Sequence, residues 1–135
     1  MTVVLCTVPH TGTQFVRSIL CRHMPDVDFG GLHGLVTVHA TDAALDQIAE
    51  HAGWISALVT TVRDREAVRV SWERRGKSLP LLDTYWSRWE RMVAARNPII
   101  VSVDAPDRED RLVALGRALG LSLETDWRPV NSWRS

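Results

Sequence analysis

The sequence has a single lysine, Lys77, only two cysteines and no excess charge, since sixteen basic and sixteen acidic side chains give a formal net charge of +0. This balance argues against bulk binding to nucleic acid or to an anionic membrane, because both normally require an excess of positive charge. The other fifteen basic residues are arginines. The planar guanidinium of arginine binds phosphate groups through two parallel hydrogen bonds, which lysine cannot form. A codon bias toward arginine is nevertheless the simpler explanation of the high ratio of arginine to lysine.

Two cysteines are too few for a disulfide framework. Cys6 lies in an apolar segment and Cys21 at the end of an expected helix, so both are typical of small core residues. The first residues do not combine a basic region, an apolar region and a small-residue cleavage site. No apolar run approaches the length that spans a membrane. We therefore expect a protein of the reducing cytoplasm.

Short apolar segments alternate with helical patterns along the chain. We expect strands at 2–8, 35–39, 56–62 and 98–103, and helices at 13–23, 41–53, 65–75, 80–96 and 107–120. Strands that are apolar on both faces and separated by helices predict a mainly parallel sheet of about four strands, covered on both sides. The expected fold class is therefore a three-layer α/β/α fold in one domain, 1–135. The tail 122–135 shows neither the helical nor the strand periodicity. We expect it to be either loose or folded over the site as a lid.

The turn from the first expected strand into the first helix, residues 9–14, is the most informative segment. A helix N-terminus offers free N–H groups and the positive end of the helix dipole. Gly12 lets the backbone approach a ligand, and the hydroxyls of Thr11 and Thr13 add donors. The segment therefore predicts a bound phosphate or sulfate, and with it nucleotide chemistry. The alternative is a plain strand-to-helix turn.

The lysine of an ATP-binding loop is missing from this turn. Such a loop reads G-x-x-x-x-G-K-[ST], whereas Gly12 is the only glycine here and Lys77 lies far downstream. Because that lysine and a metal-binding hydroxyl neutralise much of the phosphate charge, an ordinary NTPase or a nucleoside-type kinase is disfavoured.

The turn instead resembles the 5′-phosphosulfate loop of the P-loop sulfotransferases. The pattern of that loop is Pro-(Lys/Arg)-Ser-Gly-Thr-Thr, followed by an aromatic or apolar residue. The matching positions are Pro9, Thr11, Gly12, Thr13 and Phe15. The resemblance implies a P-loop NTPase-like fold and the sulfuryl donor 3′-phosphoadenosine 5′-phosphosulfate (PAPS), held by residues 9–14, which include Gln14. His10 stands where the family has Lys or Arg.

A second family element is an arginine at a strand end with a serine eight residues beyond it, the pair that holds the 3′-phosphate of PAPS. Arg63 and Ser71 have this spacing, and Arg65 replaces the proline of the family pattern. The resemblance implies that Arg63 anchors the nucleotide as a charge-assisted fork. The alternative is that neither residue binds a nucleotide: Arg63 is then a surface arginine, and Ser71 is a helical serine whose hydroxyl bonds to the preceding turn.

The segment Thr37–His39 loosely resembles the strand end that carries the catalytic histidine of the family. By this resemblance His39 is the general base that takes the proton of the acceptor. His33, in the glycine-rich loop, is the rival base. His10 is the second catalytic candidate, either as a protonated cation or as a neutral N–H donor. Residues 119–121, Leu-Gly-Leu, match the end of the last helix in the family.

We therefore expect a sulfotransferase that moves a sulfuryl group from PAPS to a hydroxyl or amine acceptor. The acceptor is a small molecule or glycan, open among sugars, phenols, lipids and peptides, and neither a nucleic acid nor a membrane is the partner. The main alternative is a non-catalytic nucleotide- or phosphate-binding module of the same fold. His10 and the missing C-terminal lid of the family favour it, although Asp126–Arg128 or Arg134 are candidates to replace that lid.

Tryptophan is abundant for this length, with six residues, and leaves room for an apolar interface in a homodimer. Trp86 and Trp89 lie one turn apart on an expected helix, which is more typical of core packing than of an acceptor pocket. The cysteines and histidines fit no common zinc spacing, so we expect no metal.

Overall fold

One sheet of four strands forms the centre of the computed structural model, which describes residues 1–31 and 33–123. The strands are β1 (Thr2–Thr7), β2 (Gly34–His39), β3 (Ala57–Val62) and β4 (Ile99–Ser102). All pair in parallel, in the order β2-β1-β3-β4. This confirms the parallel sheet predicted from the alternation of apolar strands and helices.

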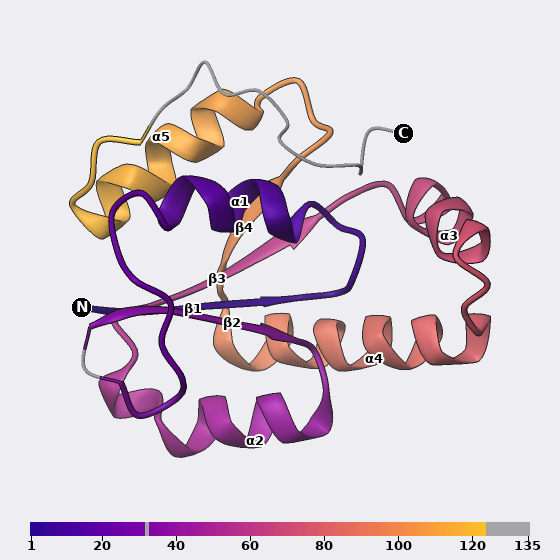
Figure 1. The fold of residues 1–135 in the computed structure, drawn as a ribbon, viewed down its shortest axis with the longest axis horizontal. Coiled ribbons are helices and arrows are strands. Elements are labelled where there is room, and N and C mark those ends of the chain that lie inside the picture. Colours follow the sequence, from indigo (N-terminus) through magenta and orange to yellow (C-terminus); the bar gives the residue numbers. More distant parts are fainter. Residues whose placement is uncertain (32, 124–135) are drawn as a thin grey trace.

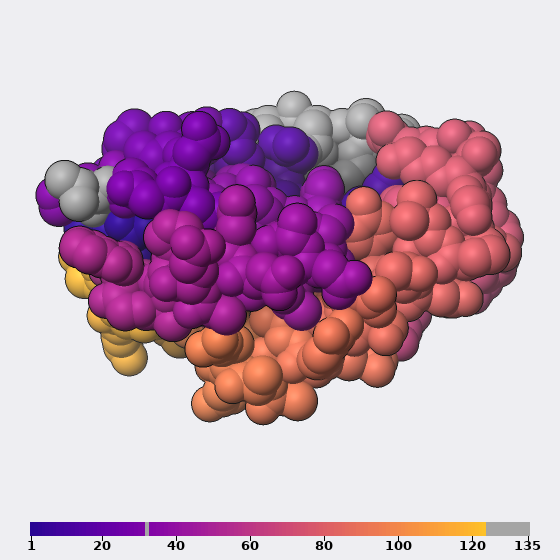
Figure 2. Space-filling model, turned by 90° about the horizontal axis from the view of Figure 1, so that it is seen from below, coloured from indigo at the N-terminus to yellow at the C-terminus, as the bar shows by residue number. Residues whose placement is uncertain are grey.

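Five α-helices and one short 3-10 turn lie between or after these strands within the described residues. They are α1 (Thr13–Leu20), α2 (Asp42–Glu50), η1 (Ala52–Trp54), α3 (Arg65–Arg74), α4 (Leu79–Arg96) and α5 (Arg108–Leu119). Helices α1 and α5 cover one face of the sheet, and α2 and α4 cover the other (Figure 1). Figure 2 shows α2 and α4 side by side on the outer surface of that second layer. The fold is therefore the expected three-layer α/β/α arrangement.

The central strand β1 is buried on both faces, and its side chains alternate between two cores. Val3 and Leu5 pack in the cluster beneath α1 and α5, whereas Val4 and Cys6 pack in the cluster beneath α2 and α4. This is the period of two that a strand imposes. Burying one such side chain contributes about 1.5–3 kcal/mol, so β1 is a rigid base for the loop that follows it.

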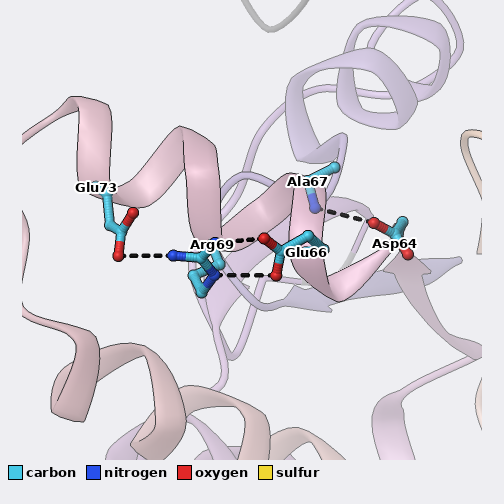
Figure 3. A network of polar contacts seen from close by, with 5 residues as sticks. All are labelled: Asp64, Glu66, Ala67, Arg69 and Glu73. Carbon is cyan, nitrogen blue, oxygen red and sulfur yellow. Dashed lines mark hydrogen bonds and ion pairs between the residues drawn. The ribbon is translucent and has the colours of Figure 1, made fainter.

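Helix α3 stands beyond the carboxyl ends of the strands, beside the first turns of α4 (Figure 1). Its start is capped by Asp64, whose carboxylate accepts from the Ala67 N–H at 2.9 Å. Along its surface Arg69 pairs with Glu66 one turn before it and with Glu73 one turn after it (Figure 3). Such exposed pairs contribute little to stability, but together with the cap they mark where α3 begins and which face it presents to solvent.

The structure differs from the sequence predictions mainly at element ends. The first helix, expected over 13–23, ends at Leu20, and a turn follows in which His23 N–H donates to Leu20 O at 2.9 Å. The turn η1 was not predicted. Residues 121–123 are not loose, because Leu121 and Leu123 pack against the core under α5. The lid expected from the tail, including Asp126–Arg128 and Arg134, lies outside the described residues.

None of the helices in the described part of the chain is both long enough and apolar enough to cross a bilayer.

Candidate anion-binding site

A cavity of about 720 Å³ opens at the carboxyl edge of the sheet, beyond the ends of β1, β2 and β3. This is the edge at which open parallel sheets bind their ligands. The cavity is lined by Pro9, His10, Gly12, Thr13, Gln14, Arg17, Asp26, Val27, Asp28, Leu35, Thr37, His39, Arg63, Ser71, Arg75 and Lys77. Almost all of the site residues predicted from the sequence therefore meet in one place.

The loop after β1 turns into α1 through two residues with positive φ. His10 has a φ of 69° and Gly12 has a φ of 92°. Holding a non-glycine residue such as His10 in this region costs about 1–3 kcal/mol, so its contacts must offset that cost. Gly12 is required for a further reason, because a Cβ atom there would lie 2.6 Å from Cγ1 of Val103.

The start of α1 carries no side-chain cap. Gly12 is the N-cap residue, and the Val16 N–H donates to Gly12 O at 3.3 Å. The N–H groups of the first helical turn have no acceptor within the helix itself, and the helix dipole favours an anion near them. Thr13 and Gln14 line the cavity at this point. The uncapped start of α1 at the cavity therefore agrees with the backbone part of the anion-binding hypothesis.

The prediction that the Thr11 hydroxyl is a donor to the ligand is wrong, because this hydroxyl is bonded within the protein, and the Thr13 hydroxyl also has a partner in β1. The hydroxyl of Thr11, which is 0 % exposed, donates to Val8 O at 2.5 Å. Its single proton is then used, so the Thr61 hydroxyl, 2.7 Å away, donates to Thr11. The hydroxyl of Thr13 lies 2.7 Å from that of Thr7. These bonds fasten the loop to β1 and β3, and Thr11 itself does not line the cavity.

Arg63 and Ser71 both reach this loop, through His10. The Ser71 hydroxyl oxygen lies 2.7 Å from Nδ1 of His10, and the Arg63 guanidinium donates to the His10 carbonyl at 3.2 Å. The ring of His10 also meets the buried ring of Trp72 edge-on, at 5.4 Å between centroids. The sequence spacing of Arg63 and Ser71 thus brings both residues to the cavity, and these contacts fix the strained His10.

Three further cations that were not predicted as site residues line the cavity: Arg17, Arg75 and Lys77. Arg17 pairs with Asp26, which leaves Arg75 and Lys77. Neither forms an ion pair with a carboxylate of residues 1–31 or 33–123. Lys77 was set aside because it is distant in sequence from the loop, yet its Nζ lies 3.5 Å from Nε2 of His10. The Arg-Arg-Gly-Lys run at the end of α3, close after Ser71, was the signal that could have found them.

Burial and positive charge together determine the protonation of His10. Loss of hydration lowers the pKa of this imidazole, and the positive charges of Lys77, Arg75 and Arg63 lower it further, to about 4. His10 is therefore uncharged at neutral pH. Of the two roles predicted for it, this environment favours the neutral N–H donor over the protonated cation.

His39 lies at the end of β2, on the rim of the cavity, with Tyr85 beside it at 6.1 Å between ring centroids. Partial burial lowers its pKa, the nearby Lys77 lowers it further, and a hydrogen bond to the Thr7 backbone opposes them. Thr37 is two residues earlier on the same face of β2. Its Oγ1 is a buried oxygen with no hydrogen-bond partner among the described residues, and a ligand in the cavity would satisfy it.

The rival residues lie elsewhere. His33 contacts the amino group of Met1 through Nδ1 at 2.6 Å, at the opposite edge of the sheet. Trp86 is 5 % exposed and packs edge-on against Trp89, whose indole donates to the Thr60 hydroxyl. Neither tryptophan lines the cavity, so they are core residues rather than an acceptor platform. Among residues 1–31 and 33–123, no group of three His, Cys, Asp or Glu side chains could hold a metal ion.

A second cavity, of about 430 Å³, lies at the amino edge of the sheet. Phe29, His51 and the exposed Trp54 contribute to it, and no lysine or arginine is among the described residues that line it. Charge therefore distinguishes the two ends of the sheet and points to the carboxyl edge as the place for an anion.

No protein-family model matches the chain, and neither a curated protein nor a solved structure matches it. The residues of the cavity and the motifs they carry are therefore the basis for assigning a function.

Proposed function

We propose that this protein transfers a sulfuryl group from PAPS to a hydroxyl or amine acceptor. The observation that carries the proposal is the convergence of the 9–14 loop, Arg63, Ser71 and His39 on one cavity. These residues come from three separate stretches of the chain, and each was selected by a motif before its position in space was considered. If the motif matches were accidental, there would be no reason for these three stretches to line the same cavity.

The cavity has the chemistry that a doubly phosphorylated nucleotide requires. The first turn of α1 would hold the 5′-phosphosulfate, and the guanidinium of Arg63 would bind the 3′-phosphate as a fork. The Ser71 hydroxyl lines the same cavity, 2.7 Å from Nδ1 of His10. The orphaned Thr37 oxygen offers a further polar contact, so the residues present fit the donor.

His39 is placed to act as the base. An uncharged imidazole is required for that role, and the lowered pKa of His39 keeps it uncharged at neutral pH. It takes the proton of the acceptor as the acceptor oxygen or nitrogen bonds to sulfur. The bond from sulfur to the bridging phosphate oxygen breaks, and 3′,5′-bisphosphoadenosine leaves. Charge that develops on that oxygen faces the N–H groups of α1.

A non-catalytic nucleotide-binding module of the same fold is the second candidate. The uncharged state of His10 favours it, because the loop itself then contributes no cation to the leaving group. The two free thiols, Cys6 and Cys21, agree with a reducing cytoplasm for either function.

Two experiments test the proposal in sequence. Thermal unfolding is followed with 3′,5′-bisphosphoadenosine and, separately, with ATP and Mg²⁺. A ligand at about 100 times its Kd stabilises the folded state by about 2.7 kcal/mol, so the bisphosphate must raise the midpoint and ATP must not. The opposite result rejects both candidate functions.

Transfer of labelled sulfate from PAPS to a panel of phenols, sugars and amines then separates the enzyme from the module. His39→Ala is expected to abolish transfer and leave the Kd for 3′,5′-bisphosphoadenosine unchanged. Absence of transfer in the wild type, with tight nucleotide binding, favours the module.

A further inference from the structure

The only lysine of the chain is held over the binding loop by three contacts. Nζ of Lys77 lies 3.5 Å from Nε2 of His10 and 4.7 Å from the ring centroid of Trp72. The Lys77 N–H donates to Trp72 O at 3.3 Å, and the Trp72 indole donates to Ser78 O at 2.7 Å. Trp72 is 2 % exposed, so the turn that carries Lys77 is fastened to a buried residue.

These contacts determine how the protons of His10 are arranged. An ammonium group only donates hydrogen bonds, so Nε2 of His10 must accept from Lys77. The one proton of the uncharged ring then lies on Nδ1 and is donated to the Ser71 hydroxyl at 2.7 Å. Both ring nitrogens are occupied, and His10 has no N–H left for a ligand. The Ser71 hydroxyl accepts from His10, so its own proton is free to be donated into the cavity.

We propose that Lys77 supplies positive charge to an anion held at residues 9–14, and that His10 positions its ammonium group. The proposal rests on the proposed function for the identity of the nucleotide, but its chemistry applies to any linked pair of tetrahedral oxyanion groups. Lys77 lines the cavity together with Gly12 and Thr13. With no carboxylate partner among the described residues, its charge is available to a ligand.

The proposal explains why an uncharged histidine is retained at a strained position. His10 connects Lys77 to Ser71 through one ring, so the cation and the hydroxyl are oriented together. Removal of the Lys77 ammonium group should therefore alter the orientation of the Ser71 hydroxyl, and removal of that hydroxyl should alter the position of the ammonium group. His10 is a positioning residue in this arrangement, and Lys77 is the ligand-contacting residue.

Titration calorimetry with pyrophosphate and with 3′,5′-bisphosphoadenosine tests this. Lys77→Ala is expected to weaken both ligands by about tenfold or more, the effect of losing a charge-assisted contact. Arg96→Ala is the matched control, because it removes one exposed positive charge from the last turn of α4, at the other edge of the sheet. It should change neither affinity by more than about twofold.

His10→Asn, which tolerates positive φ, supplies the coupling measurement. Alone it should weaken pyrophosphate, and in the Lys77→Ala background it should add little, because both changes remove the same contact. Nitrogen NMR of the His10 ring provides a readout independent of ligand. It should show a protonated Nδ1 and an unprotonated Nε2, and the Nε2 signal should move in Lys77→Ala.

The outcomes separate the two proposals. Loss of pyrophosphate affinity in Lys77→Ala, with no preference for the bisphosphate over adenosine 5′-monophosphate in the wild type, supports the role of Lys77 and counts against the nucleotide. Unchanged pyrophosphate affinity in Lys77→Ala overturns the role of Lys77 and leaves the nucleotide proposal standing. A wild type that binds neither probe overturns both.

Discussion

The Nδ1 atom of His10 lies 2.7 Å from the hydroxyl oxygen of Ser71, although the two residues are separated by 61 positions in the sequence. This bond joins the loop after β1 to α3 and forms one wall of the cavity. Because this bond connects the binding loop to α3, a substitution at His10 should alter the position of Ser71, and a substitution at Ser71 should alter the position of His10.

Arg63→Ala tests the place of the 3′-phosphate. Loss of a guanidinium fork should weaken 3′,5′-bisphosphoadenosine by about 10–100-fold, and adenosine 5′-monophosphate by much less, as measured by calorimetry. Because Arg63 also donates to the His10 carbonyl, a general loosening of the loop would weaken the two nucleotides equally. That result would remove the role assigned to Arg63.

Gly12→Ala should destabilise the fold as well as the site. The positive φ and the clash with Val103 together cost about 2–5 kcal/mol, measured as a lower midpoint in urea. Gly53→Ala is the control, since nothing lies within 4 Å of a Cβ there. Val103→Ala added to Gly12→Ala relieves the clash but leaves the strain, so it should restore only part of the loss. An alanine at position 12 with wild-type stability would contradict the loop geometry.

The lowered pKa of His10, about 4 in the folded protein against 6.5 for an ordinary histidine, predicts a pH dependence of stability. The uncharged form is favoured by folding, so this contribution is complete above pH about 6.5 and is lost as the pH falls toward 4. The groups that face the ring and oppose its protonation are Lys77, Arg75, Arg63 and His39.

Urea unfolding between pH 4 and 8 measures this contribution. His10→Asn should lose less stability than the wild type between pH about 6.5 and 4, while the difference between the two proteins stays constant above pH about 7.5. Parallel curves over the whole range would show that His10 is not the group that titrates. The same variant allows the ring signal of His10 to be assigned in NMR titrations.

The two thiols should differ sharply in reactivity. Burial raises the pKa of Cys6 to about 12, and its side chain is 0 % exposed, so a disulfide reagent should reach it only after unfolding. Cys21 is half-buried, and its pKa is raised by burial and by Asp26. We expect one slow thiol in the native protein, absent in Cys21→Ser and faster in Asp26→Asn. Two thiols that react at once would contradict the buried position of β1.

The fold was largely predictable because its signals are local. Apolar runs such as Thr2–Thr7 and the helical periods between them fix the elements, and short strands buried on both faces imply a covered parallel sheet. The helical pattern predicted that the first helix continues to residue 23, but the helix ends at Leu20. The turn that ends it depends on packing that no local pattern encodes.

Sequence motifs selected residues that share one cavity, whereas contacts between distant parts of the chain gave no signal in the sequence. Arg63, Ser71 and His39 were selected by their resemblance to sulfotransferase motifs, and the structure brings them to one cavity. The inward direction of the Thr11 hydroxyl depends on Thr61, fifty residues away, and could not be foreseen. Lys77 was discounted for its distance along the chain, although a turn after α3 returns it to the loop.

The most direct test of the account follows the backbone amides during titration with 3′,5′-bisphosphoadenosine in proton–nitrogen correlation spectra. The account predicts saturable shifts centred on Gly12, Thr13 and Gln14, accompanied by the side-chain signals of Arg63. Shifts confined to the second cavity around Trp54, or no saturable shift at residues 9–14, would contradict it.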